Sequence, residues 1–203
     1  MDKISLDDLL AGSQQLEDFA YAYKERNRVF GKQAHKDTVD WLAEELEKTK
    51  YYDVEKQEQK HLWSSSDQKL TVADKEMASA KAMTYAPSGE VTGDLFLVDN
   101  LGCTAEDFPA DVKNNIALIM RGECDFAVKV ANAGNAEAAG AIVYNNVEGD
   151  LLGTLGGPES DVGPFVPVVG ISQEEGEAVV DQVNAGTVSA DLWVETKMEN
   201  RTT

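Results

Sequence analysis

The sequence has few of the side chains that carry metal or nucleophilic chemistry. Its 203 residues include only two histidines and two cysteines. His35 and His61 belong to no His-Glu-x-x-His pattern, and the chain has no Gly-x-Ser-x-Gly motif. A catalytic zinc site needs several protein ligands around one open position. We therefore predict that this chain has no catalytic residues, no metal site and no cofactor of its own.

Long apolar runs and positive charges are also scarce. No stretch approaches the roughly 20 apolar residues that span a bilayer, and the charged start argues against a signal peptide. The 18 Lys and Arg residues face 37 Asp and Glu residues, a net charge of −19. Because phosphates are bound by basic surfaces, we predict neither nucleic acid nor a membrane as a partner. The acidity indicates a solvated surface, with attraction of cationic peptides as the alternative.

The character of the chain changes near residue 61. Residues 1–61 hold 10 basic and 14 acidic residues, whereas residues 62–203 hold 8 and 23. The first part is mostly helical: apolar residues recur at helical spacing after Ser5 and again over residues 35–48. Residues 51–57 are expected to form a strand and residues 64–67 a boundary loop. Two helices and one strand cannot close a core by themselves.

The second part is rich in short strands. Two predicted helices, residues 126–139 and 173–185, interrupt them. Ser172 and Glu175 form a capping box for the second helix, and Gly186 marks its end. The predicted fold class is α+β, a small open β-barrel or twisted sheet flanked by helices. The expected strands are residues 70–73, 77–85, 93–98, 116–120, 141–144, 166–170 and 187–194.

One stretch carries a specific pattern. A strand-like run leads into Arg121-Gly122-Glu123-Cys124-Asp125-Phe126, and an Ala-rich segment and Gly140-Ala141-Ile142-Val143-Tyr144-Asn145-Asn146 follow. Strand, tight turn, helix and strand make one βαβ unit. These residues resemble the core of the protease-associated (PA) domain, in the form inserted in secreted and vacuolar fungal zinc aminopeptidases of the aminopeptidase Y type. The turn Arg26-Asn27-Arg28-Val29-Phe30-Gly31 is similar to one that precedes the second helix of those enzymes.

The resemblance implies three parts of the chain. Residues 1–61 would open the peptidase domain, residues 62–196 would be the PA domain, and residues 197–203 would be a linker towards a catalytic zinc domain that is missing here. It also implies a disulfide between Cys103 and Cys124, which their positions at two loop edges favour as well; two reduced structural cysteines are the alternative. The parent protein would then be secreted or vacuolar, and Asn200 would be a usable glycosylation site.

The long loop 146–167 is rich in glycine and proline. Long loops in compact domains are often lids or binding loops. In the related peptidases the PA domain is thought to border the catalytic cleft, so the resemblance implies a substrate-gating loop; a passive surface loop is the alternative. The candidate gating residues are Gly153, Thr154, Leu155, Gly156, Gly157, Pro158 and Phe165.

The function that these patterns favour is that of a non-catalytic PA-domain portion of a zinc aminopeptidase. It would gate or orient peptides whose N-terminal residue the parent enzyme removes, with zinc belonging to the parent. The expected partners are the rest of the peptidase domain and a peptide substrate, with self-association through the apolar helical face. The alternative is a stand-alone PA-type module that binds peptides or proteins without peptidase activity.

Overall fold

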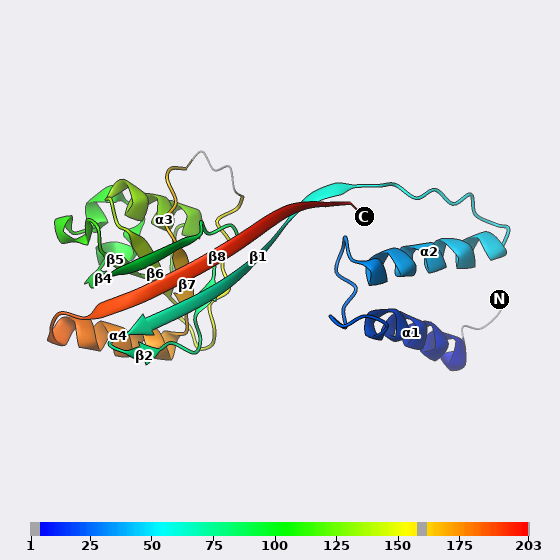
Figure 1. Cartoon of the computed structure of the whole chain (residues 1–203), viewed down its shortest axis with the longest axis horizontal. Coiled ribbons are helices and arrows are strands. Elements are labelled where there is room, and N and C mark those ends of the chain that lie inside the picture. The colour runs from blue at the N-terminus through cyan, green and yellow to red at the C-terminus, as the bar shows by residue number, and fades with distance from the viewer. Residues whose placement is uncertain (1–4, 158–161, 203) are drawn as a thin grey trace. The chain divides into compact units, whose positions relative to one another are not determined.

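The computed structural model describes residues 5–157 and 162–202 (Figure 1). The chain forms two compact units, Met1–Trp63 together with Glu199–Thr203, and Ser64–Met198. The predicted boundaries were residues 61 and 196. The last five residues, expected to belong to a linker, are part of the first unit. No helix in the described ranges is long and apolar enough to cross a bilayer.

The first unit contains the two predicted helices, α1 (Leu6–Tyr21) and α2 (Gln33–Lys48). Ser5 caps α1 through its side chain, as its position before the apolar run predicted. The helices meet at the rings of Phe19 and Trp41, whose centroids are 5.9 Å apart. Little apolar surface is buried between them: α1 has no buried residue, and α2 buries Ala34, Thr38 and Ala43.

The turn before α2 is fixed by its own side chains. The side-chain oxygen of Asn27 accepts a hydrogen bond from the backbone N–H of Val29 (3.2 Å). Gly31 has φ +74°, and a Cβ there would lie 2.5 Å from Cδ of Arg201. The buried Arg201 guanidinium in turn lies 3.3 Å from the centre of the Trp63 ring. Only glycine meets both demands at position 31, the left-handed backbone and the close approach.

The strand predicted at residues 51–57 was wrong. This segment has no regular structure, and the first strand of the chain, β1 (Lys60–Val72), begins after it. A strand is stable only when a neighbouring strand accepts and donates its backbone hydrogen bonds. No described residue forms such a ladder with residues 51–57.

The second unit is built on a mixed sheet that does not close into a barrel. In the part of the chain that the structure describes, the sheet has the strand order β2-β1-β8-β4-β5-β6-β7-β3. The predicted α+β class with an open, twisted sheet is therefore confirmed. The strands after β1 are β2 (Lys75–Glu76), β3 (Lys81–Ala82), β4 (Gly89–Leu97), β5 (Ile116–Met120), β6 (Gly140–Tyr144), β7 (Val168–Ile171) and β8 (Ser189–Thr202).

The core lies around four parallel strands. β4, β5, β6 and β7 are neighbours and run in the same direction, with Ile116 opposite Gly140 and Ala141 opposite Val168. Helix α3 (Phe126–Asn135) connects β5 to β6, which confirms the predicted βαβ unit. In Figure 1, α3 and α4 (Gln173–Ala185) lie on either side of these strands. Nearly every residue of β5, β6 and β7 is buried.

Two of the predicted strand and loop positions in this unit were wrong. The expected boundary loop, residues 64–67, lies inside β1. In the expected strand 77–85, only Lys81–Ala82 pair with β7. On either side the chain turns back on itself, because Ala80 N donates to Met77 O (3.2 Å) and Ala86 N donates to Met83 O (2.9 Å).

Helix α3 ends four residues earlier than predicted, at Asn135 instead of Ala139. Glu137 takes a left-handed backbone conformation with φ +59°. Its N–H donates to Gly134 O (3.0 Å), and Ala138 N donates to Ala133 O (3.0 Å). This pair of bonds is the Schellman arrangement, which normally has glycine at the left-handed position. Because Glu137 stands there instead, no local signal in the sequence marks the end of the helix.

The three short 3-10 helices between β4 and β5 place the first cysteine. They are η1 (Asp99–Gly102), η2 (Ala105–Asp107) and η3 (Ala110–Val112). Asn100, Leu101 and Gly102 have φ of 41°, 72° and 66°, three left-handed residues in succession. Such a turn needs strong tertiary contacts to hold it. Two of these contacts come from α3, where Lys129 donates a hydrogen bond to Leu101 O and Asn132 donates one to Gly102 O.

Candidate functional site

A cleft of about 470 Å³ opens where β5 ends and α3 begins. Residues 121–127 form one wall and residues 154–156 form the other. The structure thus brings the Arg121-Gly122-Glu123-Cys124-Asp125-Phe126 pattern next to the predicted gating loop. Clefts outside the carboxyl ends of parallel strands are common binding positions in α/β sheets, and we take this cleft as the candidate functional site.

Asn145 connects one wall of the cleft to the beginning of the loop that carries the other wall. Its side-chain oxygen accepts a hydrogen bond from Nη1 of Arg121 (3.0 Å), and its side-chain nitrogen donates to Gly149 O (3.1 Å) and Asp150 O (3.3 Å). The Asn145 side chain is 2% exposed, and its amide nitrogen and oxygen are both hydrogen-bonded, as is usual for buried polar groups. Asn145 belongs to the sequence pattern, but no role was predicted for it.

Residues 153–155 of the predicted gating loop are anchored to the neighbouring chain. Gly153 O accepts a hydrogen bond from Thr84 N (2.9 Å), and Leu155 N donates to Thr84 O (3.0 Å). The Leu155 side chain is 1% exposed and belongs to the core. A Cβ on Gly153 would lie 3.1 Å from the sulfur of Met83. Opening this wall requires breaking two backbone hydrogen bonds and exposing a leucine.

The other predicted loop residues have separate positions. Thr154 and Gly156 are exposed and line the cleft, whereas Gly157 is partly buried and does not. Phe165 is partly buried and packs against the core. Pro158 lies outside the described residues. The structure therefore brings Thr154, Leu155 and Gly156 to the cleft and leaves Gly153, Gly157 and Phe165 outside its lining.

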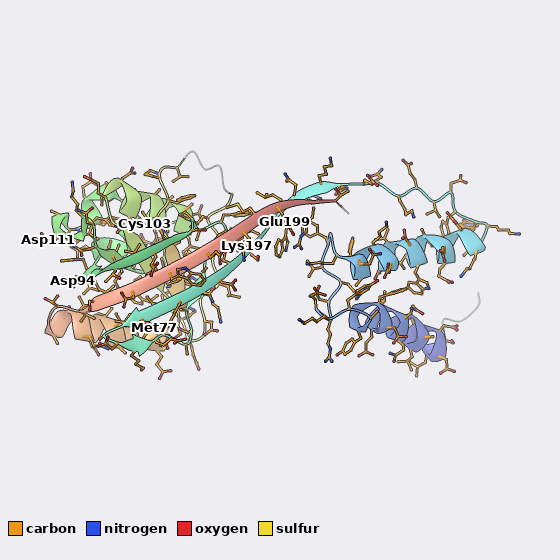
Figure 2. All side chains as sticks on the ribbon, viewed as in Figure 1. Met77, Asp94, Cys103, Asp111, Lys197 and Glu199 are labelled. Atoms are coloured by element: carbon orange, nitrogen blue, oxygen red, sulfur yellow. A yellow bond between two sulfur atoms is a disulfide. The ribbon has the colours of Figure 1, made fainter. Side chains whose placement is uncertain are left out.

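The two cysteines are joined next to the cleft. The Cys103 and Cys124 sulfurs form a disulfide with Cα atoms 5.8 Å apart, and the described residues contain no free cysteine. Cys103 is labelled in Figure 2, in the green part of the chain that also contains α3. The bond ties the segment before η2 to the turn that enters α3. Cys124 is itself part of the cleft lining.

A buried lysine supports this disulfide. Lys129, on α3, is 0% exposed, and its Nζ donates a hydrogen bond to the backbone oxygen of Leu101 and lies 3.6 Å from Sγ of Cys103. Burial lowers the pKa of Lys129, and the negative charges of Glu123 and Asp107 oppose that shift. No role was predicted for Lys129 from the sequence; the one sequence signal for it is a charged residue on the apolar face of a helix.

The carboxylate of Asp107 holds the same region from the other side. It accepts a hydrogen bond from Thr104 N (2.8 Å) and one from the side chain of Asn100 (3.3 Å). The bond from the Thr104 backbone is the main cause that lowers the pKa of Asp107, and burial of the side chain opposes it. Lys129, Asp107 and the disulfide together fix the left-handed turn 100–102 behind the cleft.

The chemical character of the cleft is mixed. Glu123 and Asp125 are exposed carboxylates at its edge, and Arg121 carries one positive charge. Phe126 begins α3, and the side chain of the N-cap residue Asp125 makes no capping hydrogen bond. Carboxylates and a helix N-terminus in one cleft offer both acceptors and donors, which suits the backbone and the terminal amine of a peptide.

The residues that were weighed as metal ligands are not brought together. His35 lies in the first turn of α2, and His61 lies in β1, where it stacks edge-on against Phe30 with ring centres 5.8 Å apart. Among the described residues, no group of three or more His, Cys, Asp or Glu side chains is placed to hold a metal ion. These residues therefore do not fit a zinc site.

The first unit has a cavity of its own. The cavity, about 590 Å³, lies between α2 and residues 54–58.

The predicted glycosylation site, Asn200, also belongs to the first unit. Asn200 is exposed on β8, with the buried Arg201 beside it and the exposed Thr202 after it.

A family model described as "PA domain" matches residues 91–179. That range contains the cleft, the disulfide and the whole βαβ unit. This chain carries a PA domain. The described part of the PA domain thus runs from β4 to the middle of α4.

The similarity to known proteins extends beyond the PA domain. The chain is 60% identical over 200 residues to a probable leucine aminopeptidase 2 from Aspergillus oryzae; the match covers 98% of this chain and 40% of that protein. The chain thus spans about 40% of the length of this curated relative. An aminopeptidase from Aneurinibacillus sp. strain AM-1 matches 94% of the chain and 46% of its own, with 28% identity and a TM-score of 0.71. A zinc aminopeptidase from Bacillus subtilis matches 95% of the chain and 44% of its own, with 26% identity and a TM-score of 0.65.

Proposed function

We propose that this chain is the non-catalytic, PA-bearing part of a zinc aminopeptidase, and that the cleft orients or gates peptides for removal of their N-terminal residue. The observation that carries the proposal is the cleft itself, where the entry of α3 meets residues 154–156. The reaction is suggested by the names of the similar proteins, a probable leucine aminopeptidase 2 and a zinc aminopeptidase. Zinc would be held by residues outside this chain.

The charge of the cleft supports a peptide as its ligand. Glu123 and Asp125 are exposed at its edge, and the whole chain has a net charge of −19. A substrate of an aminopeptidase presents a protonated N-terminal amine, which acidic surfaces attract. The volume of about 470 Å³ lies within the range of roughly 300–1,000 Å³ that is usual for ligand pockets.

The anchoring of Gly153 and Leu155 favours a gate that does not move. Because Thr84 holds both Gly153 and Leu155 through the backbone, residues 153–155 act as a fixed wall. Selection would then come from the shape and charge of the cleft and not from opening and closing. Thr154 and Gly156 are the wall residues that a passing peptide would touch.

A second function of another class has one observation in its favour. Every residue that lines the cleft belongs to the unit Ser64–Met198. The cleft therefore needs no other domain to be complete. A stand-alone PA module that binds peptides or proteins without peptidase activity would use the same residues.

The exposed apolar face of α1 suggests a partner for this chain, and the disulfide suggests a location for the parent protein. Leu6, Leu9 and Leu10 of α1 are 69%, 58% and 58% exposed. The rest of the peptidase domain would cover this face in the parent, and the isolated chain would self-associate through it. A secreted or vacuolar parent agrees with the disulfide, and there the exposed Asn200 would accept a glycan.

The proposal is tested in a chimera. This chain replaces the corresponding part of the Aspergillus oryzae relative, and Thr154→Trp is introduced to fill the cleft. We expect kcat/KM for an eight-residue leucine peptide to fall roughly tenfold, because large side chains in a cleft exclude a ligand at a cost of 1–3 kcal/mol. The rate with leucine p-nitroanilide should change less than twofold, because that substrate has no chain to reach the cleft.

The matched control is Leu152→Trp. Leu152 is in the same loop and 78% exposed, and it does not line the cleft, so both rates should remain at the unmodified level. Equal losses on both substrates with Thr154→Trp would contradict the gating proposal. If the chimera hydrolyses neither substrate while the isolated chain binds the peptide, the stand-alone module is the correct function.

A further inference from the structure

The disulfide has two unlike sulfur atoms. Cys124 lines the cleft, between the exposed residues Glu123 and Asp125. Cys103 does not line the cleft, and Nζ of the fully buried Lys129 lies 3.6 Å from its Sγ. One sulfur is thus next to an opening that a solute can enter, and the other is next to a buried amine.

Hydrogen bonds hold that amine and its helix against the turn that carries Cys103. Lys129 Nζ donates to the backbone oxygen of Leu101, and Asn132, one turn further along α3, donates through its side chain to Gly102 O (3.2 Å). The charged groups that face the lysine are the carboxylates of Glu123 and Asp107. Burial lowers the pKa of Lys129, and both carboxylates oppose that shift. In its ammonium form, Lys129 places a positive charge beside Cys103 when the S–S bond breaks.

We propose that Cys124 is a thiol-exchange site, where a low-molecular-weight thiolate attacks and Cys103 leaves as a thiolate beside Lys129. A new S–S bond forms between the incoming sulfur and Sγ of Cys124 as the Cys103–Cys124 bond breaks. The electron pair of the broken bond remains on Cys103. The incoming sulfur loses the electrons that the Cys103 sulfur gains, so no further oxidant or reductant takes part.

The direction of attack follows from access and from charge. Thiol–disulfide exchange is fastest when the attacked sulfur is accessible and the leaving thiolate is stabilised. An adjacent cation stabilises a thiolate strongly. Both cysteines of this chain are partly buried, but only Cys124 lines the cleft, and the Lys129 amine is beside Cys103. The step uses only residues of this chain, so it holds whether or not the cleft binds a peptide.

The first experiment maps the mixed disulfide in the full, oxidised chain. The chain is incubated with reduced glutathione, the reaction is stopped with acid and an alkylating reagent, and the peptides are analysed by mass spectrometry. We expect glutathione on Cys124 and the alkyl group on Cys103. Glutathione on Cys103, or equally on both residues, would overturn the proposal. In denaturant the preference should vanish; its persistence there would also overturn the proposal, because Lys129 could then play no part.

The second experiment removes the charge. Lys129→Met should slow exchange with glutathione about tenfold, because a thiolate without a nearby cation is a poorer leaving group. The control is Lys113→Met, which removes an exposed lysine that pairs with Glu137 at 2.9 Å, and it should react at the wild-type rate. A Lys129→Met chain that forms the disulfide and exchanges at the wild-type rate would contradict the proposal. If that variant does not fold, the mapping in the wild-type chain decides alone.

Discussion

At the scale of single residues, a few buried polar groups hold the turn behind the cleft. Asp107 accepts hydrogen bonds from Thr104 N and from Asn100, and Lys129 donates to Leu101 from the opposite side. The bonds to Asn100 and Leu101 restrain the left-handed segment 100–102, whose conformation is costly for residues other than glycine. The shape of this turn behind the cleft therefore depends on the Asp107 carboxylate, and this makes it sensitive to pH.

The Asp107 carboxylate should make the stability of the second unit depend on pH. Its pKa is lowered in the folded chain from 3.8, so the unfolded state binds a proton first as the pH falls. The stabilisation is fully present above pH 3.8 and is lost as the pH falls through the lower, folded pKa. In Asp107→Asn this part of the pH dependence should be absent, as followed by urea unfolding between pH 7 and pH 3.

Asp111→Asn is the matched control for this prediction. Asp111 is an exposed carboxylate in the neighbouring helix η3, so its replacement removes the same charge without removing the hydrogen bonds that Asp107 accepts. If Asp107→Asn and the wild-type chain lose stability in parallel between pH 5 and pH 3, Asp107 is not the group that titrates.

At the scale of elements, the contacts between helices and the sheet decide what each position tolerates. Helix α4 packs on β6 so closely that a Cβ on Gly176 would lie 2.2 Å from Cβ of Tyr144. Glycine in the middle of a helix normally costs about 1 kcal/mol relative to alanine. Here the lack of a side chain is what allows the helix to approach the strand.

Gly176→Ala should therefore destabilise the second unit although alanine favours helices. We expect a loss of roughly 1–3 kcal/mol, the usual cost of forcing extra atoms into a packed interface, measured by guanidinium unfolding with the disulfide intact. Gly186→Ala, at the end of the same helix, meets nothing within 4 Å and should unfold as the wild-type chain does. A Gly176→Ala variant as stable as the wild type would refute the packing that we describe.

The elements also show how far the sequence predicts this fold. The buried strands β5 and β6 and the helices α1, α2 and α4 follow from apolar periodicity and capping residues, which are local signals. The capping box predicted at α4 is only half formed: Ser172 accepts from Glu175 N (3.2 Å), but the Glu175 carboxylate accepts instead from Ala78 N (3.0 Å) and Ser79 N (3.2 Å). The Glu175 carboxylate thus binds backbone N–H groups of a distant segment instead of the backbone of its own helix, and nothing in the sequence around α4 indicates this contact.

For the candidate site as well, the sequence predicts the local patterns but not the contacts between distant segments. The sequence pattern around Cys124 and the glycine-rich loop were both identified, but the anchoring of the loop by Thr84 and the buried Lys129 were not. Both depend on contacts between segments that are far apart along the chain. The strand expected at residues 51–57 fails for a related reason, because a suitable sequence forms no strand without a partner to pair with.

At the scale of the whole molecule, the two units differ in how completely they bury their apolar residues. The second unit has a continuous core that includes Leu118, Ile142 and Leu192. In the first unit, Leu42 and Leu46 of α2 are 46% and 42% exposed, and α1 has no buried residue. The second unit thus contains the PA domain and buries its own core, and we propose that the apolar face of the first unit is covered by the catalytic part of an aminopeptidase.

The most direct test of this account is the rate of leucine p-nitroanilide hydrolysis with added zinc, measured for this chain alone and for its chimera with the rest of the Aspergillus oryzae relative. We predict no turnover by the chain alone, because its two histidines lie in separate elements and a zinc site needs its ligands together. The chimera should hydrolyse the substrate. Turnover by the isolated chain with one zinc bound per molecule and lost in His35→Ala, or a folded chimera without activity, would contradict the account.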